Sequence, residues 1–359
     1  MKICFVGPAS STHLIKWCAW FSNHGHEIHV ISFTPGEIPN THVNLLNTKV
    51  DASGNDLCKL RYLFSGRKIK KLISLIQPDV INVHYASSYG AVMALSGVSG
   101  YFLSVWGSDI YDFPRKSFLH KILLKYSLKK ATALFSTSAA MAKEAQKYTK
   151  KSFEITPFGV DLDIFTPCKR TRKAGDNRFI VGTVKGLSDT YGIRNILEAV
   201  AIVNHHFKVP IELRIAGKGP QEKEYRKIAK NLCIEDLVKW LGFISQEEAA
   251  TEWANMDIAV IPSIKESFGV SALEAQACGT PVIISDVQGL IEATAPGKSS
   301  IVVSKNNSNS IADAIIKLYE EQELRVQFGK YGREYVMNNY EINQCFERIE
   351  DSFERNFAR

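Results

Sequence analysis

Two glutamates, Glu266 and Glu274, occur in the segment KESFGVSALEAQACGTPVI (265–283) with seven residues between them. Glu266 falls in a predicted loop, and Glu274 falls on the helix predicted to follow it. Two such carboxylates could act as a general acid and base, could supply half of a metal site, or could accept hydrogen bonds from hydroxyl groups. They could equally be solvated surface residues, so the surrounding elements must decide between these alternatives.

The helix that carries Glu274 offers a site for an anion at its first turn. The segment DIAVIPS (257–263) predicts a strand, a loop follows, and the helix begins near Gly269. Free N–H groups at 268–270 and the helix dipole favour a phosphate there, beyond the carboxyl end of the strand, where open parallel sheets bind ligands. Glu274 lies about 7 Å further along the axis. That distance suits a pair of hydroxyls beside the phosphate, such as a ribose diol, while Glu266 can reach the other side.

Apolar strands alternate with amphipathic helices along the whole chain, which predicts parallel sheets covered on both faces. The pattern pauses at 157–178, a segment rich in proline, glycine and charge, and then resumes. We therefore predict an α/β protein with two Rossmann-like, doubly wound domains, the first at 1–165 and the second at 166–335. The terminal helix, 336–359, is predicted to fold back on the first domain.

The composition is that of an ordinary globular protein, with 359 residues of which 45% are hydrophobic. Seven scattered cysteines without a CxxC pair indicate reduced thiols rather than disulfides or a zinc site. The apolar stretch at the N-terminus is too short for a signal peptide, and the longest apolar run is interrupted by glycine and serine. We therefore expect a cytoplasmic protein without a transmembrane segment.

The net charge of +7 is concentrated in the first half of the chain. Residues 1–165 contain 19 Lys and Arg against 11 Asp and Glu, whereas the remainder contains 25 against 26. Two stretches, 61–76 and 114–131, mix these cations with large apolar residues at helical spacing. One interpretation is that these stretches are solvated helix faces. The other is that they form a surface that binds anionic lipid, on the inner face of the plasma membrane, or an acidic acceptor. Nucleic acid is disfavoured, because no recognised nucleic-acid module accompanies the charge.

Several motifs together resemble one enzyme family. The segment ESFGVSALEAQACGTPVIISDVQGLIE (266–292) resembles the E-x7-E region of the family 4 glycosyltransferases, a retaining family with the GT-B fold. RIAGKGP (214–220) is similar to the family's strand and Gly-x-Gly-Pro turn, WLGFISQEE (240–248) to its next strand and helix, and PFGVDLDIF (157–165) to its interdomain segment. The resemblance covers nearly the whole chain. It implies two Rossmann-like domains that face a deep interdomain cleft.

The resemblance also implies roles for individual residues. Glu274 would accept hydrogen bonds from the ribose of a nucleotide-sugar donor, and Glu266 would hold hydroxyls of the transferred sugar in the catalytic site. Backbone groups around Phe243 and Ile244 would read the base. The remaining donor-binding residues implied are Ser267, Phe268, Gly269, Val270, Lys218 and Gly182.

In the first domain, the loop GPASSTH (7–13) would face the donor phosphates and the acceptor, and WGSD (106–109) would line the cleft. The residues implied at the acceptor or cleft are Ser10, Ser11, His13, His84 and Trp106, with Asp109 as a catalytic residue. Trp106 stands where the family often has a histidine. The catalytic or sugar-binding role of that histidine cannot be assigned to an indole side chain.

The chain departs from the family where an arginine and a lysine usually clamp the diphosphate. Thr183 occupies the arginine position, and Thr190 and Tyr191 fall where the lysine is usual. A diphosphate leaving group needs charge stabilisation in the transition state. Lys185 is the nearest substitute and we predict that it is the catalytic cation, with Arg194 and Lys218 as the other candidates.

Other motifs carry less weight. DLD (161–163) imitates a D-x-D metal motif but lies in the predicted linker, and the adjacent histidines 205 and 206 do not share a helix face. GPASST lacks the G-x-G-x-x-G fingerprint of a dinucleotide site. We therefore expect no metal ion and no cofactor, only a nucleotide-sugar co-substrate.

The resemblance implies a metal-independent, retaining glycosyltransferase. The donor is expected to be a UDP-sugar and the acceptor a glycan or lipid-linked glycan, as in lipopolysaccharide or polysaccharide biosynthesis. Two alternatives remain open at this point. One is a sugar-nucleotide epimerase or hydrolase of the same fold, and the other is a non-catalytic subunit that binds nucleotide sugar.

Overall fold

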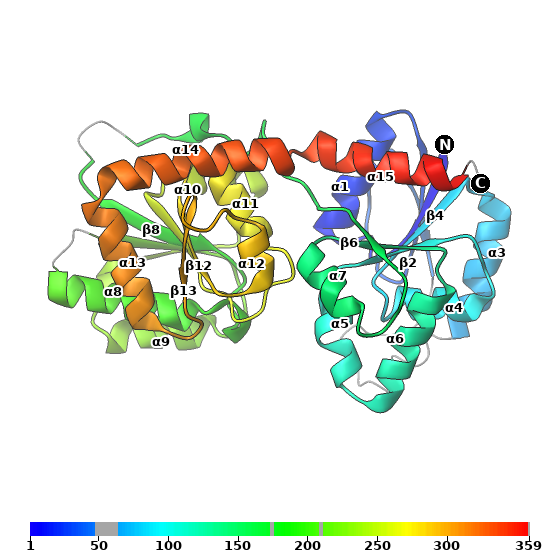
Figure 1. Cartoon of the computed structure of the whole chain (residues 1–359), viewed down its shortest axis with the longest axis horizontal. Helices are drawn as coiled ribbons and strands as arrows, with labels where there is room; N and C mark the ends of the chain where they lie inside the picture. The colour runs from blue at the N-terminus through cyan, green and yellow to red at the C-terminus, as the bar shows by residue number, and fades with distance from the viewer. Residues whose placement is uncertain (47–63, 173–175, 208–210, 358–359) are drawn as a thin grey trace. The chain divides into compact units, whose positions relative to one another are not determined.

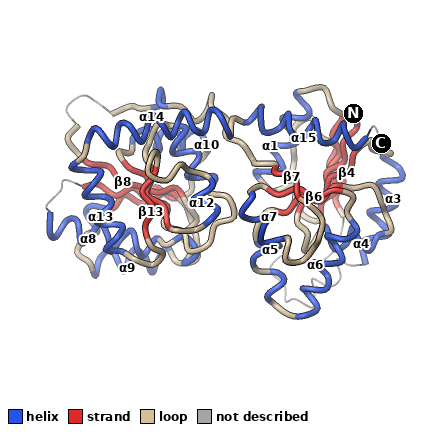
Figure 2. The backbone as a smooth tube through the Cα atoms, in the orientation of Figure 1, coloured by secondary structure: helices blue, strands red, loops and turns tan. Residues whose placement is uncertain are grey.

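The computed structural model describes residues 1–46, 64–172, 176–207 and 211–357, and its chain divides into two compact units. The N-terminal unit comprises Met1–Phe158 and Cys345–Arg359, and the C-terminal unit comprises Gly159–Gln344. Each unit is built around one parallel sheet with helices on both faces, so the predicted fold class of two doubly wound α/β domains is confirmed (Figures 1 and 2).

The sheet of the N-terminal unit pairs its described strands in parallel, in the order β3-β2-β1-β4-β5-β6-β7. These strands are β1 (Lys2–Val6), β2 (Glu27–Ser32), β3 (His42–Leu45), β4 (Val80–His84), β5 (Phe102–Val105), β6 (Ala133–Ser136) and β7 (Phe153–Ile155). The direction of strand order reverses between β1 and β4, where Phe5 lies opposite Asn82. Open sheets of this kind bind ligands beside that reversal, at the carboxyl ends of the strands.

Helices pack on both faces of this sheet. They are α1 (Thr12–Asn23), α3 (Gly66–Ile76), α4 (Tyr89–Ser96), α5 (Ser108–Tyr111), the 3₁₀ turn η2 (Phe113–Arg115), α6 (Phe118–Lys130), α7 (Ala139–Ala145) and α15 (Ile342–Phe357). Alternation along each strand gives the two faces different cores. Phe5 of β1 contacts Trp17 of α1 in an aromatic core, whereas Cys4 and Val6 join an aliphatic core with α3, α4 and α6.

The last helix belongs to the N-terminal unit from Cys345 onward. Phe346 lies edge-on to Trp17, with ring centroids 5.7 Å apart, and Phe353 lies 5.0 Å from Phe102. Glu350 pairs with the imidazole of His26 at 2.5 Å. These contacts pack α15 against the aromatic face of the sheet. Burial of the Phe346 and Phe353 rings there stabilises the packing of the last helix on this unit.

The sheet of the C-terminal unit has the described order β10-β9-β8-β11-β12-β13. Its strands are β8 (Phe179–Val184), β9 (Ile211–Ala216), β10 (Val238–Gly242), β11 (Ile258–Ile261), β12 (Val282–Ser285) and β13 (Ser300–Val303). The order reverses between β8 and β11, which pair in parallel with Ala259 opposite Gly182. This reversal is the second place where the topology favours a ligand.

Helices cover this second sheet as well. They are η3 (Pro167–Lys169), η4 (Asp189–Tyr191), α8 (Ile193–Phe207), α9 (Glu222–Asn231), η5 (Glu235–Leu237), α10 (Gln246–Asn255), α11 (Val270–Ala277), α12 (Gln288–Glu292), α13 (Ser308–Glu320) and α14 (Gln322–Asn339). One large cluster of buried aliphatic side chains joins α8 and α13 to the strands. The packed strands and helices form the scaffold, so functional residues are expected on the loops at the strand ends.

Within the described part of the chain, no helix combines the length and the apolar character needed to cross a bilayer. Part of the first basic stretch, residues 61–63, lies outside the described residues, as does Cys58.

Candidate active site

The candidate residues of the C-terminal unit gather where its strand order reverses. Lys185 directly follows β8, and the loop 262–269 leads from β11 into α11. These two loops are tied together, because the N–H of Ile264 donates to the carbonyl of Thr190 at 2.8 Å. The sequence pattern alone located this edge, and the structure places the separate segments side by side.

A buried ion pair lies at this edge. The Nζ of Lys185 is 2.6 Å from Oε2 of Glu266, and the two side chains are only 11% and 13% exposed. The hydroxyl of Ser263 donates to the same carboxylate oxygen at 3.4 Å. Burial on its own lowers the pKa of Lys185, but Glu266, with Tyr191 and Glu274, outweighs burial and raises that pKa above its usual value. Lys185 is therefore a fixed positive charge at neutral pH.

Tyr191 gives Lys185 a second partner, which the sequence did not reveal. The ring of Tyr191 lies 4.9 Å from the Lys185 ammonium, within the range of a cation–π contact. Tyr191 is one of the two positions, with Thr190, where the resemblance led us to expect a lysine. The chain therefore supports one cation with an aromatic ring instead of adding a second cation.

Glu274 lies on α11 and is partly exposed, one helical turn after the loop that carries Glu266. Its charge helps to raise the pKa of Lys185 and, after burial, that of Cys278, which reaches about 12. Both glutamates thus act electrostatically on one cation.

The loop before α11 is held closely against α12 (Gln288–Glu292). A Cβ atom at Gly289 would lie 2.5 Å from the carbonyl oxygen of Glu266 and 2.9 Å from the nitrogen of Phe268. Glycine is therefore needed at 289 for the loop to pass. The Phe268 ring is buried against Tyr340, with centroids 5.4 Å apart. These contacts fix the backbone at the start of α11, where helix N–H groups are free of helical partners.

The turn after β9 packs against the loop that carries Lys185. Gly217 has a φ of 135°, and a Cβ there would lie 1.9 Å from the carbonyl oxygen of Lys185. The turn can therefore approach the Lys185 loop only because residue 217 is glycine. The carbonyl of Lys218 accepts a hydrogen bond from the N–H of Leu187 at 3.1 Å, while Lys218 itself is exposed.

The other predicted donor residues are spread around this edge. Val270 is the first residue of α11 and Gly269 is its N-cap, while Ser267 lies in the loop before them. Phe243 and Ile244 follow β10, and Phe243 is exposed.

Gly182 and Thr183 lie in β8, and Arg194 lies in α8. Gly182 is inside the strand, where a Cβ would lie 2.5 Å from Cε of Met256, so core packing requires glycine there. Its predicted contact with the donor stays a prediction. Thr183 is fully buried, and its hydroxyl has no hydrogen-bond partner within the described residues. Arg194 forms an ion pair with Glu224.

The N-terminal unit gathers its predicted residues at the corresponding edge of its own sheet. His13 stacks on Phe158 with a centroid distance of 3.8 Å, and Trp106 lies edge-on to His13 at 5.8 Å. Ser10 is exposed, and Ser11 is the N-cap residue of α1. Phe158 was missed from the sequence, although it precedes a glycine in the interdomain motif.

His84 ends β4 and is completely buried beside Trp17 and Trp106. Neither of its ring nitrogens has a hydrogen-bond partner among the described residues. Burial, with a smaller contribution from His13, lowers the pKa of His84 to about 3, and burial followed by Lys16 lowers that of His13 to about 4. Both imidazoles are therefore neutral at pH 7.

Asp109 has the surroundings of a positioning residue, and the catalytic role predicted for it stays a prediction. It is fully buried, and its carboxylate accepts hydrogen bonds from the N–H groups of Ala86, Trp106 and Gly107 at 2.8, 3.2 and 2.8 Å. Burial raises its pKa, although these three donors act in the opposite direction. Asp109 thus joins the loops after β4 and β5.

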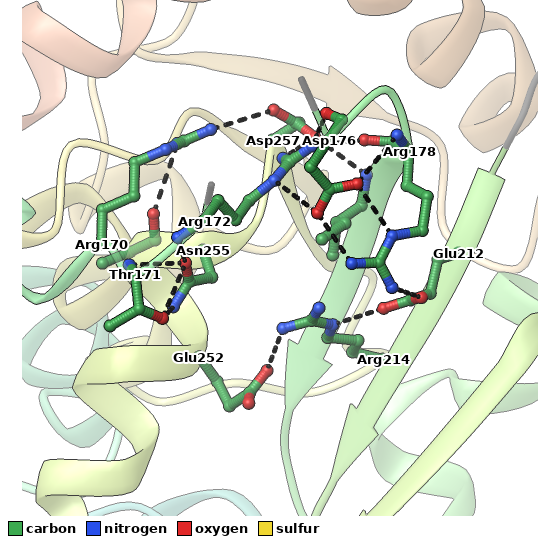
Figure 3. Close-up of polar contacts among 12 residues, drawn as sticks. Arg170, Thr171, Arg172, Asp176, Arg178, Glu212, Arg214, Glu252, Asn255 and Asp257 are labelled. Carbon is green, nitrogen blue, oxygen red and sulfur yellow. Dashed lines mark hydrogen bonds and ion pairs between the residues drawn. The ribbon is translucent and has the colours of Figure 1, made fainter. Parts of the chain in front are cut away.

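A second charged cluster of the C-terminal unit lies at the amino ends of its strands (Figure 3). Arg172 donates to Asp257 at 2.5 Å, and the N–H of Ile180 donates to the same carboxylate at 2.9 Å. The side-chain oxygen of Asn255 accepts from the N–H groups of Thr171 and Arg172. These contacts attach the segment that precedes β8 to the end of α10.

The same cluster continues across β9. Glu212 accepts from Arg178 and Arg214, both at 2.7 Å, and Arg214 also donates to Glu252 of α10 at 2.9 Å. Asp176 pairs with Arg178 at 2.7 Å. Cations and carboxylates alternate through this network, so its charges are neutralised by one another.

The motifs judged weak have local explanations. The carboxylate of Asp161 accepts from the N–H groups of Asp163 and Ile164, and so caps a turn. His205 is exposed, and the side chain of residue 206 lies outside the described part. A search of the described residues finds no group of three or more His, Cys, Asp or Glu placed to hold a metal ion.

Family models match most of the chain. The model described as "Glycosyl transferases group 1" matches residues 168–335, and the model "Glycosyl transferase 4-like" matches residues 2–138. The chain is a glycosyltransferase, and its match to the group 1 model lies in the C-terminal unit. The residues just described in the C-terminal unit, from Lys185 to Glu274, all fall inside the first of these matches.

Curated relatives of this glycosyltransferase differ in the share of the chain that they match. The chain is 34% identical over 185 residues to a D-inositol 3-phosphate glycosyltransferase of Pseudarthrobacter chlorophenolicus, covering 49% of the chain and 44% of that protein. The matching part therefore spans about half the length of that relative. The chain is 24% identical over 343 residues to the N-acetyl-alpha-D-glucosaminyl L-malate synthase of Bacillus anthracis, covering 91% and 88%.

Solved structures share the fold of this glycosyltransferase at low identity. A sucrose-phosphate synthase of Thermosynechococcus elongatus has a TM-score of 0.84 at 19% identity, with full coverage of both chains. Anabaena HepE, solved with UDP-glucose, has a TM-score of 0.79 at 17% identity, covering 99% of this chain and 100% of that one. WaaG, which is involved in lipopolysaccharide biosynthesis, has a TM-score of 0.77 at 14% identity, covering 98% and 99%. The fold is that of GT-B glycosyltransferases.

Proposed function

We propose that this protein transfers a sugar from a UDP-sugar to a hydroxyl of a glycan or lipid-linked glycan. The observation that carries the proposal is the Lys185–Glu266 ion pair beside the start of α11, at the strand-order reversal of the C-terminal unit. A diphosphate needs cationic and N–H donors, and a sugar needs carboxylate acceptors. This edge supplies both kinds of group within one site.

In this proposal the diphosphate is held by the free N–H groups at the start of α11 and by Lys185. Glu274 accepts hydrogen bonds from the ribose, and Glu266 accepts them from the transferred sugar. Lys185 then exchanges part of its contact with Glu266 for the phosphate oxygens. Because the family's arginine is replaced by the buried Thr183, Lys185 is the cation that we assign to the departing diphosphate.

The reaction that we propose breaks the bond between the anomeric carbon and the diphosphate oxygen. A bond from the acceptor hydroxyl to the anomeric carbon forms on the same face, and the hydroxyl proton passes to the departing phosphate oxygen. Configuration is retained and no metal ion is required, since Lys185 and the helix start supply the stabilising charge. Positioning provides most of the rate acceleration in such a step.

The acceptor that we propose is bound by the N-terminal unit, at the edge that carries His13 and Trp106. Both histidines at this edge are neutral at pH 7, and aromatic rings surround them. Such an edge suits an uncharged sugar ring better than a second phosphate. A lipid-linked glycan at the inner face of the plasma membrane, of the kind used for lipopolysaccharide or other polysaccharides, is consistent with the likeness to WaaG.

A thermal-shift screen against UDP-, GDP- and ADP-sugars tests the donor, because a ligand of the folded state raises the melting temperature by mass action. We expect UDP-sugars to stabilise the protein and the other nucleotides to have little effect. Stabilisation by none of them would contradict the proposal.

Transfer of radiolabelled sugar to a lipid-linked acceptor then tests the reaction. Release of UDP without any acceptor would indicate a hydrolase, interconversion of the donor sugar an epimerase, and donor binding without turnover a non-catalytic subunit.

A further inference from the structure

Helix α6 of the N-terminal unit exposes large apolar side chains. The exposed fractions are 75% for Phe118, 75% for Leu119, 47% for Ile122 and 36% for Tyr126. At about 100° per residue, these four positions fall within an arc of about 100° on the helix surface. Leu124 and Leu128 of the same helix are fully buried and lie on nearly the opposite side. The helix therefore has two apolar faces, and only one of them is used by the core.

Cations surround the exposed apolar face. No acidic residue occurs between Asp112 and Glu144, whereas seven Lys or Arg residues do. Lys121 and Lys125 flank one side of the apolar arc, and Lys129 lies within the arc near the end of the helix. All three are exposed, and no ion pair engages them among the described residues. Lys130 flanks the other side, where its ammonium lies 5.5 Å from the Tyr126 ring.

Helix α3 lies on the same face of the sheet as α6. It packs, as α6 does, against α4 on the aliphatic face of the sheet (Figure 1). Arg67, Lys68, Lys70 and Lys71 are exposed on it. Phe64, just before its first turn, and Leu75, near its end, are exposed as well. The described residues 64–78 contain no acidic side chain. Two helices of one face thus repeat the combination of exposed apolar groups and exposed cations.

We propose that α6, together with α3, is the surface by which this protein rests on an anionic lipid bilayer. The lysines approach the phosphate headgroups, and Phe118, Leu119, Ile122 and Tyr126 enter the boundary between headgroups and acyl chains. This attachment is independent of the proposed sugar transfer, since it uses none of the residues assigned to the donor or the acceptor.

The composition of the surface favours a bilayer over other anionic or apolar partners. A second copy of the chain would bring two sets of like charges together, which is unfavourable. A nucleic acid would satisfy the lysines but would leave the aliphatic side chains of Leu119 and Ile122 without an apolar environment. A mixed bilayer matches both components at once.

Cosedimentation of the full chain with lipid vesicles tests the attachment. Vesicles of phosphatidylcholine alone are compared with vesicles containing phosphatidylglycerol, at low and at high salt. We expect binding to the anionic vesicles only, and weaker binding as salt screens the lysines. The triple variant Lys121→Gln/Lys125→Gln/Lys129→Gln is expected to bind on the order of 100-fold more weakly, about fivefold for each lysine.

A second variant separates apolar insertion from simple charge attraction. Phe118→Ser/Leu119→Ser keeps every lysine, so electrostatic attraction alone would leave its binding unchanged. We expect at least a tenfold loss, most evident at high salt. Because both side chains are exposed, the folded unit is expected to keep its circular dichroism spectrum and its melting temperature.

Matched controls come from the C-terminal unit. Lys223→Gln/Lys227→Gln/Lys230→Gln removes three exposed lysines from α9, and Val326→Ser/Met337→Ser removes two exposed apolar groups from α14. Both are expected to bind vesicles as the unaltered protein does. If the α6 and α9 lysine variants lost vesicle binding equally, net charge alone would explain the binding and the proposal would be overturned.

Two further outcomes would also overturn it. Sedimentation of the unaltered protein with anionic vesicles to no greater extent than with neutral ones would exclude the bilayer as the partner. A change of mass in analytical ultracentrifugation for Phe118→Ser/Leu119→Ser, without a change in vesicle binding, would identify α6 as an interface between copies of this chain.

Discussion

The two charged clusters of the C-terminal unit lie at opposite ends of the same sheet and are built differently. At the amino ends, Arg172 and Asp257 belong to a network in which cations and carboxylates alternate (Figure 3). At the carboxyl ends, Lys185 meets Glu266 with an aromatic ring beside it and the start of a helix nearby. Charges that neutralise one another stabilise a fold, whereas a cation beside free helix N–H groups can still accept an anion.

The largest expected effect is at the carboxyl edge. Glu274→Ala removes the proposed acceptor for both ribose hydroxyls, and hydrogen bonds to a charged group contribute about 1.5–3 kcal/mol each. We expect kcat/KM for UDP-sugar transfer to fall at least about 100-fold, with UDP binding weakened in isothermal titration calorimetry. Glu320→Ala, on the exposed surface of α13, serves as the control. Near-normal kinetics for Glu274→Ala would refute its assigned role.

The amino edge is expected to respond in stability instead. Asp257→Ala removes the acceptor for Arg172 and for the N–H of Ile180, and leaves a guanidinium largely buried. We expect the free energy of unfolding to fall by about 2–3 kcal/mol in urea denaturation, with UDP affinity unchanged. Glu222→Ala breaks the exposed pair with Arg226 and should cost about 0.5 kcal/mol or less. If Asp257→Ala lost UDP affinity under conditions where the variant is fully folded, the proposed difference between the two edges would be wrong.

Strand positions and the place of the site could be predicted from the sequence because they depend on local patterns. Each strand end follows a short apolar run, and a glycine marks the turn at 217. The reversal of strand order then brings the carboxyl ends of β8 and β11 together. The two glutamates could therefore be placed at the edge before any contact was known.

Partners joined across long stretches of chain could not be predicted in the same way. Lys185 and Glu266 are 81 residues apart, and Arg172 and Asp257 are 85 apart. The charges of 157–178 were interpreted as marks of a linker, although those of Arg172, Asp176 and Arg178 form ion pairs within the C-terminal unit. Asp109 was assigned a catalytic role from its position in WGSD. Its three backbone donors come from two loops, and only the tertiary structure reveals them.

Two substitutions of Lys185 test whether its charge or the exact position of that charge matters at the carboxyl edge. Lys185→Ala removes the proposed diphosphate cation and leaves Glu266 largely buried without its partner, so we expect UDP affinity to fall about 10- to 30-fold. Lys185→Arg keeps the charge and should recover part of that affinity, although the planar guanidinium fits this pocket differently. Isothermal titration with UDP and with uridine measures both. Equal losses for UDP and uridine in Lys185→Ala would mean that Lys185 does not contact phosphate.

The smallest effect tests whether the aromatic ring positions Lys185. Tyr191→Leu removes the cation–π contact at 4.9 Å, which contributes about 0.5–1 kcal/mol at sites of this kind, so UDP affinity should fall about two- to fivefold. Tyr191→Phe keeps the ring and should bind UDP as the unaltered protein does. If the hydroxyl rather than the ring were responsible, Phe and Leu would weaken binding equally. In a Lys185→Ala background the Tyr191→Leu change should have no further effect, because a ring that acts only through the ammonium has nothing left to hold.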